Sequence, residues 1–196
     1  MTVMLRLCSW LALAWLWLLI TCLPVAAEPV ISETVRKYRI NGRTAQELRL
    51  EMNRKGPAGA DGRRFDAYTA WRVDWNYRWW ENPAECRLTK VTTRVRVSFT
   101  LPEWHQYDRG SPELQQKWDR YYEALHAHEK GHRDFGLRAA RDIEQVIGGI
   151  GWRRTCAQLE KDANAAAQTI LDHYILLEKQ YDIETEHGAA TGAVFP

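Results

Sequence analysis

The chain has 196 residues, with 27 Lys and Arg against 25 Asp and Glu, which gives a formal net charge of +2. A balance this close to neutral supplies no strong field to attract nucleic acid or an anionic membrane, and we expect no nucleic-acid partner. The length is enough for one domain with a substantial hydrophobic core.

Residues 1–27 have the pattern of a secretory signal peptide. A short segment with one positive charge, at Arg6, precedes the almost wholly apolar run Leu7–Leu23, and Val25-Ala26-Ala27 offers small residues for cleavage. The apolar run is barely long enough to span a bilayer, and a retained anchor is the alternative. We therefore expect a periplasmic or secreted protein with one domain over residues 28–196 and no stable membrane insertion after cleavage.

The next part of the chain predicts a strand, a short helix and a loop. Residues 30–40 are typical of a strand, and a turn follows at Asn41-Gly42. Thr44 fits the N-cap of a helix that runs to Asn53, with Glu47 in the capping-box position.

Two alternating runs then predict a long antiparallel hairpin. From Phe65 onward apolar and polar residues alternate, and after a break at Asn82-Pro83 a second alternating run extends to Leu101. The apolar face of this hairpin should carry the helices. Its members are Phe65, Ala67, Thr69, Trp71, Val73, Trp75, Tyr77 and Trp79, followed by Val91, Thr93, Val95, Val97, Phe99 and Leu101.

The tryptophans of the first run have two interpretations. Trp71, Trp75 and Trp79 are compatible with a sugar-binding surface, but their alternation favours core positions. Trp80 breaks the alternation and is the better candidate for an exposed aromatic side chain.

Two long helices complete the predicted fold. Ser111 fits an N-cap before Pro112, and apolar residues recur every three or four positions as far as Val146. A second helix is predicted from about Thr155 to Tyr181, followed by a tail without periodicity. We expect an α+β fold in which an antiparallel hairpin or sheet packs against these two helices.

The segment His128-Glu129-Lys130-Gly131-His132 has the form H-E-x-x-H and lies on the first long helix. His128 and His132 are one turn apart and continue the apolar stripe, so both imidazoles can reach one metal ion. Glu129 is within reach of a metal-bound water, the arrangement of a zinc hydrolase. The alternative is a pair of core histidines that are bonded to other protein groups.

The cysteines of the mature chain are Cys86 and Cys156. An even pair in an oxidising compartment favours one disulfide, and two unpaired buried thiols are the alternative. The bridge would join the start of a strand to the start of the last helix and restrict the unfolded chain.

Taken together, several of these features resemble a bacterial family of unknown function. They are the H-E-x-x-H helix, Leu101-Pro102 at the end of the preceding strand, the paired cysteines and the tail from Tyr181 to Gly188, with the pattern Y-D-x-x-T-x-H-G. Members of that family are described as predicted secreted zinc-dependent proteases. The resemblance covers essentially the whole mature chain and implies a zincin-like peptidase, without naming a substrate.

A catalytic zinc usually has three protein ligands and a water, so His128 and His132 need one more partner. His187 follows the last helix, matches the tail pattern of the family and is the favoured third ligand. The alternatives are His173, Glu160 and Glu178.

These residues predict a zinc-dependent peptidase that acts on a peptide or protein of the cell envelope. With Zn²⁺ held by the three histidines, Glu129 would take a proton from the attacking water and pass it to the leaving amine. Tyr181 is a candidate donor to the oxyanion, and Asp182 a candidate to orient a histidine ligand. An edge of the hairpin would bind an extended peptide by strand addition.

Two other classes of function fit the same residues. One is a non-enzymatic envelope module with a structural metal, in which the aromatic hairpin binds a partner or a cell-wall glycan. The other is a zinc amidase that acts on cell-wall material with the same catalytic residues. The sequence does not specify the oligomeric state.

Overall fold

The computed structural model describes residues 28–59 and 62–196, so the predicted signal peptide lies outside the described residues. Within these ranges, no helix is long and apolar enough to cross a membrane. In chain order the elements are β1 (Val30–Ile40), α1 (Ala45–Lys55), β2 (Tyr68–Glu81), β3 (Cys86–Trp104), a 3₁₀ turn (Tyr107–Arg109), α2 (Pro112–Gly148), β4 (Trp152–Arg153), α3 (Cys156–Thr185) and a second 3₁₀ turn (Ala189–Thr191).

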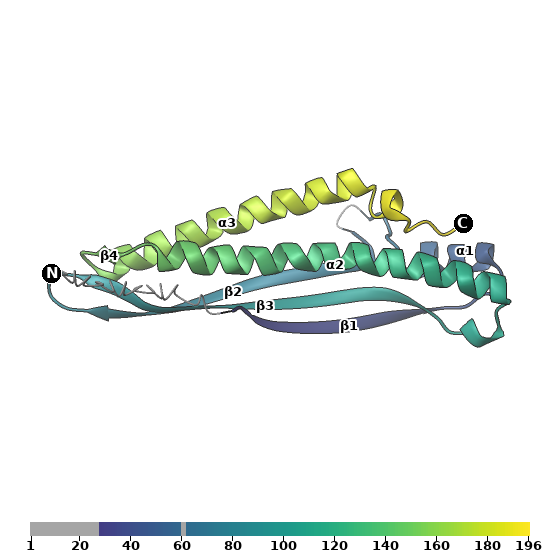
Figure 1. The fold of residues 1–196 in the computed structure, drawn as a ribbon, viewed down its shortest axis with the longest axis horizontal. Helices are drawn as coiled ribbons and strands as arrows, with labels where there is room; N and C mark the ends of the chain where they lie inside the picture. The colour runs from purple at the N-terminus through teal and green to yellow at the C-terminus, as the bar shows by residue number, and fades with distance from the viewer. Residues whose placement is uncertain (1–27, 60–61) are drawn as a thin grey trace, which may run out of the picture.

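The sheet has the strand order β1-β3-β2, with β4 paired to the first residues of β3. β2 and β3 form the predicted antiparallel hairpin, whereas β1 joins the other edge of β3 in parallel. Figure 1 shows an elongated molecule in which α2 and α3 both lie on one side of the sheet. Val73, Val95 and Phe99 are buried beneath the helices, which confirms the predicted apolar face over most of its length. The prediction of a core position was wrong for Trp79, which lies beyond a register shift near the end of β2 and is 41% exposed.

Helix α2 begins where the sequence predicts. The Ser111 hydroxyl accepts a hydrogen bond from the Leu114 amide, and Pro112 occupies the first helical position. The helix buries a continuous stripe against β2 and β3, in which Leu125, His128, His132 and Phe135 follow one another. The two histidines are therefore held by the packing of a 37-residue helix on the sheet.

The described residues form three α-helices, one more than the two long helices of the predicted fold class. The third, α1, was expected as a separate short element. Its cap is Thr44, whose side chain accepts a hydrogen bond from the Glu47 amide, and Leu48 and Met52 are fully buried. α1 contacts β1 and adds these side chains to one end of the core, where Met52 also lies against Tyr121 of α2.

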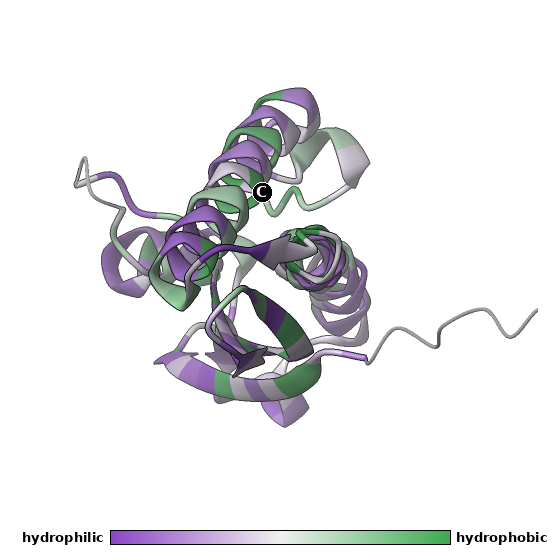
Figure 2. Cartoon of the chain, turned by 90° about the vertical axis from the view of Figure 1, so that its left-hand side faces the viewer, coloured by the Kyte–Doolittle hydropathy of each residue, from purple (hydrophilic) through white to green (hydrophobic). Residues whose placement is uncertain are grey.

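Helix α3 extends further than the sequence predicts, and the tail after it is packed. α3 runs to Thr185 rather than Tyr181, which places Asp182 on the helix, one turn after Glu178. Beyond the second 3₁₀ turn, Phe195 is buried against Trp118 and Tyr121 of α2. Figure 1 shows the C-terminal segment continuing past the end of α3, above the first part of α2, and Figure 2 gives the end-on view. Burial of one Phe side chain contributes about 2 kcal/mol toward holding this tail on α2.

The predicted disulfide is present between Cys86 and Cys156. It joins the first residue of β3 to the first residue of α3, at the end of the molecule that carries β4. The bridge encloses α2 within its loop, so it restricts the chain that carries both histidines.

Candidate metal centre

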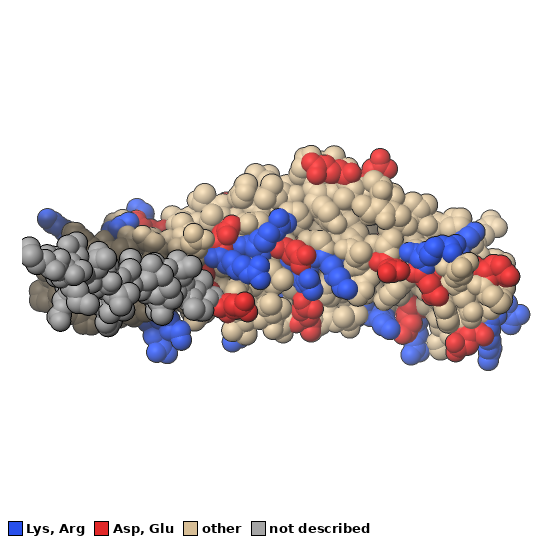
Figure 3. All heavy atoms as spheres, viewed as in Figure 1, with Lys and Arg blue, Asp and Glu red and all other residues tan. Residues whose placement is uncertain are grey.

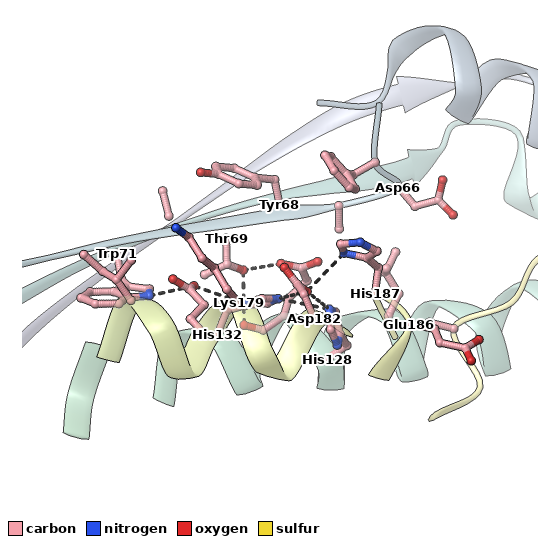
Figure 4. Close-up of a pocket in the computed structure, with 18 of the residues that line it drawn as sticks. Asp66, Tyr68, Thr69, Trp71, His128, His132, Lys179, Asp182, Glu186 and His187 are labelled. Carbon is pink, nitrogen blue, oxygen red and sulfur yellow. Dashed lines mark hydrogen bonds and ion pairs between the residues drawn. The ribbon is translucent and has the colours of Figure 1, made fainter. Parts of the chain in front are cut away.

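Two histidines of α2 and one carboxylate of α3 meet between the long helices. His128 and His132 are 4% and 7% exposed, and Asp182 is half-buried. His128 Nε2 lies 3.1 Å from His132 Nε2, and Asp182 Oδ1 lies 3.3 Å and 3.1 Å from these two nitrogens. Figure 4 shows the three side chains converging below β2. These three residues can hold one metal ion.

The outer ring nitrogens of both histidines are occupied. His132 Nδ1 lies 3.0 Å from Glu178 Oε1, and a carboxylate can only accept, so this nitrogen carries the hydrogen. His128 Nδ1 lies 3.4 Å from the hydroxyl of Thr185, which itself donates to the Tyr181 carbonyl at 2.7 Å. His128 Nδ1 is therefore also a donor in the neutral ring. Both Nε2 lone pairs consequently point to the same place, as in metal sites whose histidines are oriented by outer partners.

The hydrogen bond between Trp71 and Glu178 extends this outer network to the sheet. Trp71 Nε1 donates to Glu178 Oε1 at 2.9 Å, the same oxygen that contacts His132. Trp71 is half-buried and packs on the core, so β2 fixes the Glu178 carboxylate from the opposite side of the cavity. The rotamer of His132 thus depends on α2, α3 and β2 together.

The carboxylates give the site a negative potential. Burial by itself would lower the pKa of His132, but hydrogen bonds with Asp182 and Glu178 outweigh it and raise the pKa to about 9. Burial also acts to raise the pKa of Asp182, but the hydrogen bonds from His128 and His132 hold it well below its ordinary range. Asp182 is therefore ionised at neutral pH, and the site favours a cation between the two rings.

Glu129 lies beside this cluster with its carboxylate buried. Its side chain is 4% exposed, and Oε2 accepts a hydrogen bond of 2.6 Å from the Thr69 hydroxyl. Burial raises the pKa of Glu129, although Thr69 and the nearby histidines partly oppose this effect. A carboxylate with a raised pKa that lines a cavity has the properties of a general base.

A cavity of about 770 Å³ opens over the cluster. Residues 64–73 of β2 and the preceding loop form one wall, and α3 forms the other. β2 pairs only with β3 among the described strands, so the wall includes an edge of the sheet. On the α3 side, Lys179 and Glu186 lie at the rim, as Figure 4 shows. The cavity is large enough for several residues of an extended chain.

The structure places the other predicted site residues at different distances from the cluster. His187 is about half-exposed and its Nδ1 lies 3.4 Å from Asp182 Oδ1, so it borders the cluster. Glu178, an alternative third ligand, contacts the outer nitrogen of His132. His173 and Glu160 are exposed on α3, and neither lines the cavity. Asp182, expected to orient a histidine, instead contacts both Nε2 atoms.

Tyr181 lies behind the cluster. Its ring stacks on His128 with centroids 4.9 Å apart, and its hydroxyl donates to the His128 carbonyl at 3.3 Å. It is not among the residues that line the cavity. This position suits a residue that fixes His128 better than one that donates to an oxyanion.

The contributions of Thr69, Trp71 and Thr185 were not predicted from the sequence. Thr69 and Trp71 were assigned to the buried face of β2, which is correct, but the alternation carries no signal for their polar contacts with α2 and α3. The spacing of Glu178, Asp182 and Thr185 by four and three residues was a usable signal, because it places all three on one helical face.

The fold and the site define an α+β protein with a candidate metal centre of two histidines and a carboxylate between its two long helices. The family model of bacterial proteins of unknown function, DUF922, matches residues 35–188, and the chain belongs to this family. The match includes every residue of the cluster. Neither the curated proteins nor the solved structures include a match to this chain.

Proposed function

We propose that this protein is a zinc-dependent peptidase of the bacterial cell envelope. The observation that carries the proposal is the convergence of three electron-rich atoms, His128 Nε2, His132 Nε2 and Asp182 Oδ1, within 3.1–3.3 Å of one another. Without a metal, the raised pKa of His132 places a proton between these acceptor atoms, and a metal ion can take the place of that proton. The outer hydrogen bonds fix the rings in this orientation.

The spacing also fits zinc. Ligands bound at about 2.0–2.1 Å in a tetrahedron lie about 3.3 Å apart, close to the observed separations. Two imidazoles and one carboxylate form the donor set of many catalytic zinc sites, in which the fourth position remains open for a water. His128, His132 and Asp182 would therefore hold the ion, and His187 would border it through Asp182.

A zinc ion held by these residues would supply a Lewis acid that makes the attacking water more acidic. Glu129 then accepts a proton from the attacking water and transfers it to the leaving amine. Thr69 orients Glu129 through a 2.6 Å hydrogen bond, and burial keeps the carboxylate basic enough for this transfer. Throughout the reaction, Glu178 accepts the Nδ1 hydrogen of His132 and Thr185 accepts that of His128.

The position of β2 favours a peptide as the substrate. Its free edge forms a wall of the cavity beside Glu129, and an extended peptide can add to such an edge through main-chain hydrogen bonds. This mode of binding needs no particular side chain, so it favours peptides over small molecules as a class. The predicted secretory signal favours proteins of the envelope as the natural substrates.

The test compares Glu129→Gln with Glu144→Gln. Glu144 is a matched control because it is also a buried glutamate of α2 that accepts from a threonine of the sheet, Thr93, but it lies outside the cavity. We expect wild type to contain one zinc by elemental analysis and to cleave members of a peptide library. Glu129→Gln should keep the zinc and lose activity by at least about 100-fold, whereas Glu144→Gln should keep both.

Two results would contradict this assignment. Undiminished cleavage by Glu129→Gln would exclude Glu129 as the general base. Absence of zinc from wild type, with none recovered on titration, would make His128 and His132 ordinary core histidines. Cleavage of cell-wall amides but not of peptides would keep the metal centre and change the substrate class.

A further inference from the structure

The side of the sheet that faces away from the helices is strongly basic. We call it the open face, because no described element covers it. Residues that pair directly across neighbouring strands have their side chains on the same face of the sheet. Val73 and Val95 pair with each other and are buried on the side of α2, so the residues before and after each of them in the sequence point away from α2. The basic members of the open face are all exposed: Arg36, Arg72, Arg78, Arg87, Lys90, Arg94 and Arg96. Asp74 is the acidic residue on the described strands of this face.

This arrangement has a cost in stability. Arg72 lies directly opposite Arg96, and Arg78 directly opposite Lys90. Like charges in directly opposed positions destabilise a sheet. Asp74 compensates the first pair, with ion pairs of 3.1 Å to Arg72 and 2.6 Å to Arg96. The second pair has no such compensation on the described part of the open face, so folding alone does not explain it.

One end of the open face carries tryptophans. The register places Trp80, Arg87 and Trp152 in one row across β2, β3 and β4. Trp80 and Trp152 are 46% and 60% exposed, and the Arg87 guanidinium lies 5.0 Å from the centre of the Trp80 ring. Exposed tryptophans beside arginines are suited to the headgroup region of a membrane, where one part of the ring is apolar and the N–H stays hydrated.

The side of the molecule that carries α2 has a different distribution of charge. Figure 3 shows Lys and Arg interspersed with Asp and Glu over the broad side that carries α2. The net charge of +2 therefore conceals a segregation, in which positive charge gathers on the open face. Local charge of this kind determines adsorption to a surface when the net charge does not.

We propose that the open face binds the surface of an anionic phospholipid bilayer as a peripheral contact. The cations extend across β1, β2 and β3, and from Arg87 to Arg96 they cover about 30 Å along β3. A two-dimensional array of this size fits a planar surface better than a single polymer chain, which would follow one line of charges. The metal centre lies on the helical side of the sheet, so a chain adsorbed in this way keeps its cavity directed to the aqueous side. This proposal does not depend on the reaction at the metal centre.

The test is vesicle co-sedimentation of residues 28–196, the expected mature chain, because the apolar run Leu7–Leu23 would itself enter vesicles of either composition. Phosphatidylcholine vesicles with and without phosphatidylglycerol are compared at about 0.1 M salt, where screening still permits contact at the headgroups. The variant is Arg78→Thr, Lys90→Thr, Arg94→Thr, which retains residues suited to strands. The matched control is Lys117→Gln, Arg120→Gln, Arg141→Gln, which removes the same charge from exposed positions of α2.

We expect wild type to bind the anionic vesicles and not the neutral ones. Each basic residue near such a surface contributes a factor of about five, so the open-face variant should bind about 100-fold more weakly, and the α2 control within about twofold of wild type. The open-face variant should melt close to wild type, because loss of the repulsive pair Arg78 and Lys90 offsets loss of Arg94 opposite Asp74. Equal losses in both variants, or no binding by wild type, would overturn the proposal. Binding to soluble polyphosphate without binding to vesicles would also overturn it and indicate a polymeric partner.

Discussion

The ring of Tyr181 occupies the space beside Gly131, where α3 packs against α2 next to the candidate metal centre. A Cβ at position 131 would lie 2.6 Å from Tyr181 Cζ, so an L side chain there requires the ring to move. Gly131 lies between the two histidines of the motif, and Tyr181 precedes Asp182 in the sequence. The glycine therefore permits α3 to bring its carboxylate to the histidines.

Gly131→Ala should lower both stability and metal affinity. Overpacking costs about 1–3 kcal/mol, partly offset by about 0.5–1 kcal/mol from the better helix propensity of Ala. Gly148→Ala is the control, because nothing lies within 4 Å of a Cβ at that helical position. Urea denaturation and zinc titration measure the two effects. Unchanged zinc affinity in Gly131→Ala would show that the metal centre does not depend on the position of Tyr181.

Asp182 and His187 should differ in their effect on zinc binding. Asp182 Oδ1 contacts both Nε2 atoms, whereas His187 contacts only Asp182, at 3.4 Å. We expect Asp182→Ala to lose more than about 100-fold in zinc affinity and His187→Ala to lose about 10-fold, the effect of an outer partner. Asp172→Ala, an exposed carboxylate of α3, is the control. The measurement is zinc binding in competition with a chelator.

The reverse order of these effects would support the sequence-based hypothesis that His187 is the third ligand. That hypothesis rested on the family tail pattern. The tail contains both residues, and the pattern alone does not distinguish the side chain that faces the histidines from its neighbour. The position on the helix does distinguish them. Asp182 is on the same face of α3 as Glu178, whereas His187 comes after Glu186, whose left-handed backbone conformation ends the helix.

Local patterns predicted most of the architecture. Alternation identified β2 and β3, the spacing of apolar residues identified α2 and α3, and Thr44 and Ser111 marked two helix starts that the structure confirms. The pairing of Cys86 with Cys156 was also correct. In each case the physical signal lies within one element, or follows from the number of cysteines in the chain.

The remaining features depend on contacts between distant segments. β1 pairs with β3 in parallel, and most of its side chains are exposed, so no apolar period specified its partner. Helix α3 continues to Thr185 through a polar sequence because Asp182 and Thr185 contact the histidines of α2. Phe195 packs on α2 although the tail before it has no periodicity. Such contacts depend on how distant segments pack together, which local sequence patterns do not specify.

Loss of the disulfide should destabilise the fold without altering the metal centre. The bridge closes a loop of 70 residues, for which the chain-entropy relation gives about 4 kcal/mol. Cys86→Ser, Cys156→Ser should therefore unfold at a lower urea concentration. Cys156 lies about 40 Å along α3 from Asp182 at 1.5 Å per residue, so zinc affinity should stay within about twofold. A large loss of zinc affinity would instead show that the far end of α3 positions the site.

A buried tyrosine network should make the protein sensitive to alkaline pH. The Tyr121 hydroxyl donates to Asp66 Oδ2 at 2.6 Å, and the Tyr38 hydroxyl donates to the Asp66 carbonyl at 2.6 Å. Burial, followed by the charge of Asp66, raises the pKa of both phenols above their ordinary value of 10.0. The folded state thus retains these protons at a pH where the unfolded chain releases them. Their stabilising contribution is complete below about pH 10 and is lost as pH rises toward the raised values.

The urea midpoint of wild type should therefore fall between about pH 9 and pH 11. Tyr121→Phe should be less stable at pH 8 by about 1–2 kcal/mol, because Asp66 loses a hydrogen bond, but its midpoint should fall less steeply at high pH. Tyr68→Phe is the control, because Tyr68 is 51% exposed and lies outside the network. Equal slopes for wild type and Tyr121→Phe would show that alkaline unfolding begins elsewhere. If the urea midpoint of Tyr121→Phe alone falls less steeply with pH, alkaline unfolding begins at the contact between Tyr121 of α2 and Asp66. Asp66 also pairs with Arg49 of α1.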